Sequence, residues 1–296
     1  MKILISGSSG FIGTALTNHL RKNENEVIRL LRNSTSLKNE IKWNIDNKDY
    51  NIGDFEGIDS FINLSGENVF GIWTKEKKRK IIDSRINSTQ LLYEIISKLK
   101  KPPKTFISAS AIGYYGNRGD ELLDEDSDKG SGFFPDLAEQ WENISKQAEK
   151  LNIRVVNIRI GLVLSKDGGA LSKMLTPFKL GLGGKIADGK MYWSWIALDD
   201  ILASIEFILR NDNIKGAVNL VSTNPLKNNE FTHILGNVIN RPTFLPVPKL
   251  FIEYLLGDMG REALLASTRV VPKKLLDNGY KFKYTELKKT LKYLLR

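Results

Sequence analysis

Short apolar runs alternate with helical patterns through the first two thirds of the chain. The helical patterns cover residues 11–21, 75–99 and 136–150. The strand-like runs are residues 2–6, 26–31, 41–43, 60–64, 105–109 and 154–158. Alternating strands and helices are typical of right-handed crossovers, which build a parallel sheet covered by helices on both faces. The pattern therefore predicts an α/β fold with a doubly wound, Rossmann-type parallel sheet.

The pattern changes after residue 158. Residues 165–195 are rich in glycine and carry aromatic residues near their end, which we interpret as a substrate loop region rather than more sheet. A helix is expected over 199–209, with Asp199 as its N-cap. Residues 217–221 could return as a further strand of the main sheet. The final part of the chain, from about residue 240, is expected to be mostly helical.

A glycine-rich turn stands between the first predicted strand and the first predicted helix. Its sequence is Gly7-Ser8-Ser9-Gly10-Phe11-Ile12-Gly13. In the order strand, turn and helix, Gly7 permits a tight turn, Gly10 lets the backbone approach a pyrophosphate, and Gly13 lets the helix pack closely. The helix N-terminus adds free N–H groups and a positive dipole end. This segment predicts a dinucleotide-binding site.

The end of the second predicted strand bears on the choice of dinucleotide. Sites that prefer NAD place an acidic side chain there, on the adenosine ribose. This strand ends Arg29-Leu30-Leu31-Arg32 and has no acid. Because Arg32 could pair with the 2′-phosphate of NADP, we expect NADP as the cofactor, in preference to NAD.

These patterns divide the chain into two regions. Residues 1–164, with the strand near 217–221, are expected to form an NAD(P)-binding Rossmann domain. Residues 165–296 are expected to form the substrate side, including the smaller helical C-terminal lobe. A substrate cleft is expected between the two.

Composition narrows the chemistry. The chain has no cysteine and only two histidines, His19 and His233. A thiolate nucleophile is therefore excluded, and we expect no metal site and no serine–histidine triad. The formal net charge is +10, and the densest basic run covers residues 75–80. We interpret that run as a solvated helix face and expect no nucleic-acid partner.

No apolar stretch is long enough to span a bilayer, and the first apolar run is too short for a signal peptide. We therefore expect a cytoplasmic protein without a membrane partner.

Several motifs resemble the extended short-chain dehydrogenase/reductase superfamily, also called the NAD-dependent epimerase/dehydratase superfamily. More specifically, the chain resembles its atypical sugar-nucleotide-epimerase-like family, whose members have their own C-terminal domain. The glycine-rich turn and Ser108-Ala109-Ser110 match the superfamily. The matches to the narrower family are Asn63-Leu64-Ser65-Gly66-Glu67, Ile112-Gly113-Tyr114-Tyr115-Gly116, Gly168-Gly169-x-Leu171-x-Lys173-Met174-Leu175, Leu180-Gly181-Leu182-Gly183-Gly184 and Trp195-Ile196-x-x-Asp199-Asp200. These matches run over essentially the whole chain.

The resemblance implies a role for each matching position. Cofactor contacts are implied at Gly7, Gly10, Phe11, Ile12, Gly13, Arg32, Leu64, Ser65, Gly66, Ser108 and Ala109. Ser110 stands at the place of the catalytic serine, which hydrogen-bonds a substrate carbonyl or hydroxyl.

The sequence departs from the superfamily at the proton-transferring pair. Active members use a tyrosine as the acid or base, with a lysine four residues later that lowers its pKa. Aligning the corresponding helix on Trp141-Glu142 places Phe134 and Ala138 at these two positions. Phenylalanine has no proton to give and alanine has no charge, so the usual proton relay is absent.

Other side chains could replace the pair. Tyr115, and beside it Tyr114, could face the nicotinamide, and Tyr115 is our candidate proton donor, although aromatic packing explains both tyrosines equally well. Glu67 is a candidate base. Lys173 or Arg85 could bind an anionic group of the substrate.

Two functions remain open from the sequence. The first is an NADP-dependent oxidoreductase or epimerase-like enzyme that acts by hydride transfer on a small polar substrate, such as a nucleotide sugar. The alternative is a non-catalytic NADP-binding protein with a regulatory or redox-sensing role. The helices over 75–99 and 136–150 are candidates for the contact of a homodimer.

Overall fold

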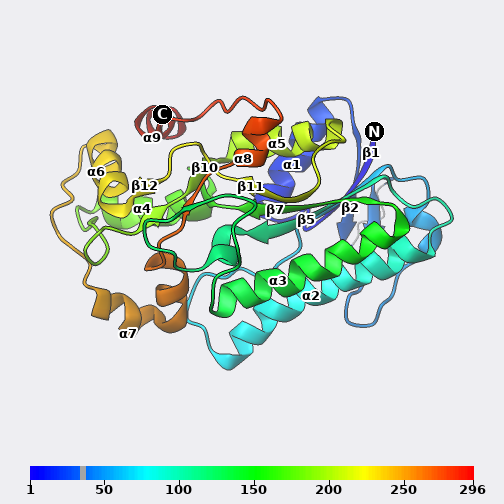
Figure 1. Cartoon of the computed structure of the whole chain (residues 1–296), viewed down its shortest axis with the longest axis horizontal. Helices are drawn as coiled ribbons and strands as arrows, with labels where there is room; N and C mark the ends of the chain where they lie inside the picture. Colours follow the sequence, from blue (N-terminus) through cyan, green and yellow to red (C-terminus); the bar gives the residue numbers. More distant parts are fainter. Residues whose placement is uncertain (34–37) are drawn as a thin grey trace.

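A seven-stranded parallel sheet forms the centre of the molecule (Figure 1). The structure is a computed structural model, and it describes residues 1–33 and 38–296. The strand order is β11-β7-β5-β4-β1-β2-β3. The strands are β1 (Lys2–Ser6), β2 (Glu26–Leu31), β3 (Glu40–Lys42), β4 (Ser60–Asn63), β5 (Thr105–Ala111), β7 (Arg154–Ile160) and β11 (Gly216–Leu220). The chain crosses from β1 to β2 on one side and returns to β4 on the other, which creates the switch point where such sheets bind ligands.

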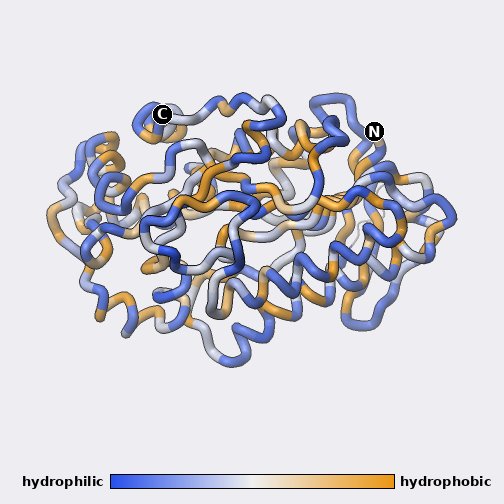
Figure 2. The backbone as a smooth tube through the Cα atoms, viewed as in Figure 1, coloured by the Kyte–Doolittle hydropathy of each residue, from blue (hydrophilic) through white to orange (hydrophobic). Residues whose placement is uncertain are grey.

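Helices cover both faces of the sheet. Helices α1 (Phe11–Lys22) and α5 (Leu198–Arg210) lie on one face, and α2 (Lys75–Lys98) and α3 (Phe133–Lys146) lie side by side along the other (Figure 1). Side chains of a strand point alternately to the two faces. Ile3 and Ile5 accordingly pack in the core beneath α1 and α5, whereas Leu4 packs in the core beneath α2. Figure 2 shows hydrophobic residues along the central strands and alternating hydrophobic and hydrophilic residues along the flanking helices. The predicted Rossmann-type architecture is confirmed.

The remaining elements build the C-terminal side. They are β6 (Leu122–Leu123), β8 (Leu162–Ser165), α4 (Gly169–Lys179), β9 (Tyr192–Trp193), β10 (Trp195–Ala197), β12 (Leu226–Lys227), α6 (Asn228–Ile239), α7 (Lys249–Met259), β13 (Arg269–Val270), α8 (Lys273–Asp277) and α9 (Leu287–Leu294). A separate apolar cluster joins α4, α6 and α9 around the buried Trp195 and Phe231. The interpretation of residues 165–195 as loop was wrong for α4, because the apolar face of this short helix closes that cluster.

The prediction that Asp199 caps a helix is wrong. Helix α5 begins one residue earlier, and Ala197 occupies its N-cap position. The Asp199 carboxylate instead accepts a hydrogen bond from the Tyr284 hydroxyl at 3.1 Å. The buried Asp200 accepts the main-chain N–H groups of Lys283 and Tyr284. The two carboxylates therefore fasten the C-terminal tail to the start of α5.

The basic run at residues 75–80 forms the first turns of α2, and much of its charge is paired. Lys77 bonds Glu67 at 2.6 Å, Lys80 bonds Glu76 at 2.7 Å, and Lys78 contacts Asp258 of α7. These pairs agree with a helix surface that also ties α2 to the C-terminal side. Within the described residues, no helix has the length and apolar character needed to cross a membrane.

Candidate active site

The glycine-rich turn is held against the next sheet loop by contacts that only glycine allows. Gly7 has a φ of +67°, and a Cβ there would lie 2.5 Å from the carbonyl oxygen of Leu64. A Cβ on Gly13 would lie 2.1 Å from the carbonyl oxygen of Gly7. Both approaches are far inside van der Waals contact. Gly7 therefore closes the turn onto the loop after β4, and Gly13 lets α1 start directly behind it.

The start of α1 is equipped to receive an anion. Gly10 stands at the N-cap, and among the described residues no side chain caps this helix. The Ser8 hydroxyl is buried and has no hydrogen-bond partner among the described atoms. A helix start with free amide groups carries a partial positive charge. The main-chain amides, the dipole and this hydroxyl together fit a pyrophosphate.

A buried polar network fixes the loop after β4, which carries Leu64, Ser65 and Gly66. The Ser6 hydroxyl donates to Asn63 Oδ1 at 2.6 Å, and the Ser65 N–H donates to the same oxygen at 3.2 Å. Asn63 Nδ2 in turn donates to Thr89 of α2 at 2.8 Å. This side-chain amide therefore sets the position of the loop that the resemblance assigns to the cofactor.

A cavity of about 450 Å³ opens at the carboxyl edge of the sheet. The predicted site residues that line it are Ile12, Leu64, Ser65, Gly66, Ala109 and Ser110. Ser108 is buried behind this wall, and Arg32 is exposed directly after β2. The structure thus brings the loops after β1, β4 and β5 together at one site. Arg32 stands apart from the cavity, at the end of the neighbouring strand.

Phe134 and Ala138 both line this cavity, from the first turns of α3. The Phe134 ring packs edge-on against Trp73 at 5.0 Å between centroids. The alignment that placed these residues opposite the usual tyrosine and lysine therefore puts them on the expected wall. At this wall the site offers an apolar ring and a methyl group in place of a hydroxyl and an ammonium.

Behind Ser110 lies a buried ion pair that the sequence analysis missed. The Ser110 hydroxyl donates to Glu142 Oε1 at 2.7 Å. Arg159 holds the same carboxylate with two hydrogen bonds, from Nε at 2.8 Å and from Nη2 at 2.9 Å. Burial opposes the charge of Arg159, but the hydrogen bonds and the charge of Glu142 outweigh it and hold the arginine pKa above its usual value. A charged residue inside the apolar run of β7 was the available signal.

The structure places Tyr115 away from the cavity. Its side chain is fully buried, its hydroxyl donates to Asn219 Oδ1 at 2.8 Å, and it accepts from Arg159 Nη1 at 2.9 Å. Burial raises the pKa of Tyr115 to about 12. The Arg159 guanidinium stacks on the Tyr114 ring at 3.5 Å. These contacts match the packing alternative for both tyrosines, and the Tyr115 hydroxyl supports Arg159 instead of facing the cavity.

The remaining candidates, Arg85, Lys173 and Glu67, differ in whether they line the cavity and in the partners they contact. Arg85 lines the cavity. Lys173 lies over the Phe70 ring at 4.6 Å and is not among the lining residues. Glu67 is bonded to Lys77, and this hydrogen bond is the main reason that its pKa lies below the usual value. Among the described residues no group of three or more His, Asp or Glu side chains is placed to hold a metal ion.

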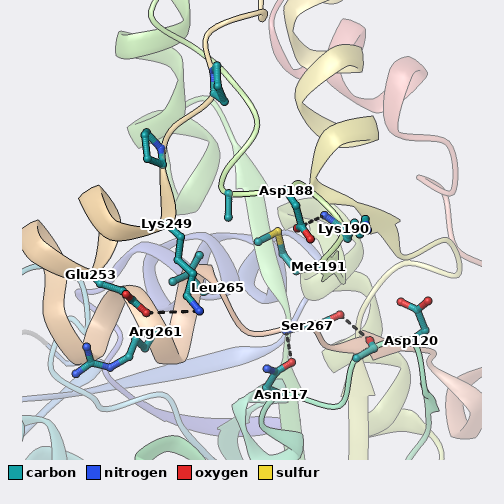
Figure 3. A pocket seen from close by; sticks show the side chains of 14 residues that line it. Asn117, Asp120, Asp188, Lys190, Met191, Lys249, Glu253, Arg261, Leu265 and Ser267 are labelled. Atoms are coloured by element: carbon teal, nitrogen blue, oxygen red, sulfur yellow. Dashed lines mark hydrogen bonds and ion pairs between the residues drawn. The ribbon is translucent and has the colours of Figure 1, made fainter.

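A second, larger cavity of about 850 Å³ lies on the C-terminal side (Figure 3). Figure 3 shows Asp188 and Lys190 on one wall, and Lys249, Glu253 and Arg261 on the other. None of the predicted site residues lines it.

Residues 264–268 run between the two cavities. Leu265 and Ser267 line the larger one, whereas Leu264, Ala266 and Thr268 line the smaller one. One stretch of backbone therefore forms a partition, with alternate side chains turned to opposite sides.

Comparison with known proteins settles the family. Residues 3–220 match the model of the NAD dependent epimerase/dehydratase family. The chain belongs to this family. Residues 247–294 match a second model, described as a domain of unknown function. An epimerase family protein of Mycobacterium leprae (strain TN) is 35% identical over 98% of this chain and 94% of its own length.

Two solved structures of family members show how far the likeness extends. Human epimerase family protein SDR39U1 (isoform 2), crystallised with NADPH, is 31% identical with a TM-score of 0.89, and the match covers 99% of each chain. A nucleoside-diphosphate sugar epimerase from Corynebacterium glutamicum is 31% identical with a TM-score of 0.82, covering 100% of this chain and 58% of that one. The family fold therefore includes the C-terminal side as well as the sheet.

Proposed function

We propose that this protein is an NADPH-dependent oxidoreductase or epimerase-like enzyme that acts on a small polar substrate in the 450 Å³ cavity. The observation that carries the proposal is Ser110 on the cavity wall, bonded to a carboxylate that a buried arginine holds in place. A structural wall alone would not need a buried charge pair, since apolar groups of the same shape are as stable there.

The cofactor would be held mainly by main-chain groups. The amides at the start of α1 would receive the pyrophosphate, and Leu64, Ser65, Gly66 and Ala109 would line its path along the sheet edge. Arg32, exposed after β2, would meet the 2′-phosphate of NADP, and the NADPH bound to the human relative supports this preference. When bound, the nicotinamide supplies or accepts a hydride.

Ser110 would handle the proton. Its own hydrogen points to Glu142, so its oxygen lone pairs are free to accept a hydrogen bond from the cavity. A substrate hydroxyl that loses its proton would give it to Ser110 Oγ, while the Ser110 proton moves to the Glu142 carboxylate. Reduction of a carbonyl would run the same transfer in reverse. This route needs neither a tyrosine at residue 134 nor a lysine at residue 138.

The cavity walls favour a substrate with a flat or ring-shaped body. Trp141, Tyr192 and Trp193 line it, and aromatic faces suit sugars and other ring compounds. A nucleotide sugar fits this description, and the relative from Corynebacterium glutamicum is a nucleoside-diphosphate sugar epimerase.

Deuterium transfer tests the function directly. The protein is incubated with NADPH deuterated at C4 and a panel of small aldehydes, ketones and keto-sugars, and products are examined by mass spectrometry. We expect transfer to at least one substrate, and a fall of about 100-fold in rate for Ser110→Ala, within the range for loss of acid–base catalysis. A Ser172→Ala variant on α4, outside the cavity lining, is the control. Tight NADPH binding without transfer to any substrate contradicts the proposal.

A second function is favoured by Phe134 and Ala138 on the cavity wall. A protein that only binds NADPH has no need of the acid–base pair, and it would act as a redox sensor or regulator. The same experiment separates the two functions, because a sensor binds NADPH and transfers nothing.

We also propose that α2 and α3 provide the contact of a homodimer. The two helices run side by side along one outer face of the molecule (Figure 1). Sedimentation velocity at micromolar concentration tests this, and a monomer at every concentration contradicts it.

A further inference from the structure

Arg85 is the cation of the candidate active site. It projects from α2 to the wall of the 450 Å³ cavity, near the loop that carries Gly66. Nη1 donates to the carbonyl oxygen of Ile81 at 3.0 Å, and Nη2 donates to that of Glu67 at 3.1 Å. The guanidinium lies over the Trp141 ring at 5.3 Å. Two carbonyl groups and one aromatic face therefore hold the charge in one orientation.

No carboxylate within the described residues is in ion-pair distance of Arg85. The nearby Glu67 carboxylate bonds Lys77 instead. The other charged residue of the cavity wall, Glu262, accepts weak hydrogen bonds from the N–H groups of Phe133 and Phe134, at the positive end of α3. Burial lowers the pKa of Arg85 to about 10, still well above neutral pH. The guanidinium is therefore a half-buried positive charge that a ligand anion would stabilise.

The position of Arg85 favours a substrate group over a phosphate of the cofactor. Gly7, Gly10 and Gly13, which mark the pyrophosphate end, are not among the residues that line this cavity. Arg85 lies beside Gly66 of the proposed cofactor path, and it shares the cavity with Ser110 and Phe134, where the reaction would take place.

The absence of a side chain at Gly66 is a second observation that concerns the Arg85 guanidinium. A Cβ at residue 66 would lie 3.2 Å from both Cζ and Nη2 of Arg85. The absence of a side chain at residue 66 therefore leaves room for the guanidinium, and both residues line the cavity.

We propose that the substrate carries a carboxylate or phosphate group, which Arg85 binds while the reacting carbon lies at Ser110. The inference rests on the proposed function, because it names the chemical class of substrate for the same cavity. An arginine fork can form two parallel hydrogen bonds to either anion, which fixes the orientation of the substrate as well as its affinity.

A matched pair of probes tests the inference. 4-Carboxybenzaldehyde carries an anion and an aldehyde, and 4-formylbenzamide replaces the anion with a neutral amide of nearly the same shape. Binding to the NADPH-loaded protein is measured by calorimetry, and reduction is followed by NADPH absorbance. We expect the carboxylate to bind at least about tenfold tighter, as one charge-assisted hydrogen bond would give. The 3-carboxy isomer and its amide cover a second spacing.

The variants Arg85→Gln and Arg85→Lys show whether Arg85 causes the preference for the carboxylate probe. Arg85→Gln should remove the preference for the carboxylate, and Arg85→Lys should keep part of it. Arg79→Gln, on the exposed face of the same helix, is the control and should change nothing. Thermal unfolding of each variant verifies the fold, and NADPH affinity without a probe is measured for each.

The outcomes are distinct. An unchanged carboxylate preference in Arg85→Gln overturns the inference. So does a loss of NADPH affinity in that variant that accounts for the whole effect, because Arg85 would then bind the cofactor. If the amide binds as tightly as the carboxylate and is reduced at the same rate, the proposed function stands and the inference fails. If the carboxylate binds through Arg85 but neither probe is reduced, the anion site stands and the proposed function is in question.

Discussion

The two ends of the cofactor groove are built in different ways. At the phosphate end, between β1 and α1, the structure relies on main-chain amides and on glycines whose Cβ would overlap a neighbouring carbonyl. At the proposed reaction end, between β5 and α3, it relies on side chains: Ser110, Glu142 and Arg159. The phosphate end requires one backbone conformation, which few sequences allow. The proposed reaction end requires charged and polar side chains, which different residues can supply from different elements.

This contrast bears on the missing acid–base pair. Phe134 and Ala138 stand where the resemblance implies a tyrosine and a lysine, and both residues line the cavity wall. A glycine of the turn has no such substitute. Substitutions at the two ends should therefore have different effects on stability and on cofactor binding.

The largest expected effect is at the reaction end. Glu142→Ala leaves Arg159 buried without its counter-charge, and we expect a loss of about 3–5 kcal/mol in the free energy of unfolding. Glu139→Ala removes a carboxylate of the same helix that pairs with Lys129 at the surface, and it should cost at most about 1 kcal/mol. Urea unfolding measures both free energies of unfolding. Equal losses would show that the buried ion pair contributes no more to stability than the surface pair.

The next effect concerns the glycines of the turn. Gly13→Ala places a methyl group 2.1 Å from the Gly7 carbonyl oxygen, and we expect a loss of about 1–3 kcal/mol in stability together with NADPH binding. At Gly10 the nearest atom would be 3.2 Å away and φ is −75°, so Gly10→Ala should keep its melting temperature but bind NADPH more weakly.

Gly53→Ala is the control for these two variants, since its nearest neighbour would be 3.5 Å away. Melting curves with and without NADPH separate loss of fold from loss of binding. Full NADPH affinity in Gly10→Ala would mean that the pyrophosphate does not approach the main chain there.

A smaller effect is expected at Arg32, where a side chain acts at the phosphate end. Arg32→Asp should weaken NADPH binding by about 10- to 100-fold, the equivalent of one or two charge-assisted hydrogen bonds, and leave NADH binding nearly unchanged. Calorimetry with both cofactors measures the ratio. An unchanged ratio excludes Arg32 as the group that recognises the 2′-phosphate.

The smallest expected effect is a pH dependence at Glu67. The hydrogen bond from Lys77 lowers the pKa of this carboxyl below its usual value of 4.5. A lowered carboxyl pKa stabilises the fold above the unfolded pKa, and this stabilisation is lost as the pH falls through the folded pKa. The side chain is 42% exposed, so the effect should stay below about 1 kcal/mol. The stability gap between the protein and Glu67→Gln should be present at pH 7 and shrink as the pH falls below 4.5, toward the lowered pKa of the folded state.

The sequence predicted the sheet well because alternation and glycine are local signals. The seven strands of the main sheet, β1–β5, β7 and β11, lie within a few residues of their predicted bounds, and the glycine-rich turn lies where its spacing places it. The absence of the tyrosine and lysine was also visible, and the structure puts Phe134 and Ala138 on the cavity wall.

The charge pair behind Ser110 could not be read from the chain in the same way. Arg159 interrupts the apolar run of β7 and so gives a local signal of a buried charge, but its partner Glu142 lies on α3, where the sequence does not distinguish it from a surface residue. Tyr115 attracted attention by its place after the serine strand, but its hydroxyl turns to Asn219 and Arg159. Asp199 showed a helix-start composition, yet its partner, Tyr284, lies in the distant tail. Partnerships between remote segments leave no local pattern.

The backbone between residues 264 and 268 is shared by two compartments, while its side chains are not. Leu265 and Ser267 line the larger cavity, and Ala266 and Thr268 line the smaller one. Substitutions along this segment can therefore change the wall of one cavity at a time, whereas a shift of its shared backbone would move the walls of both cavities together.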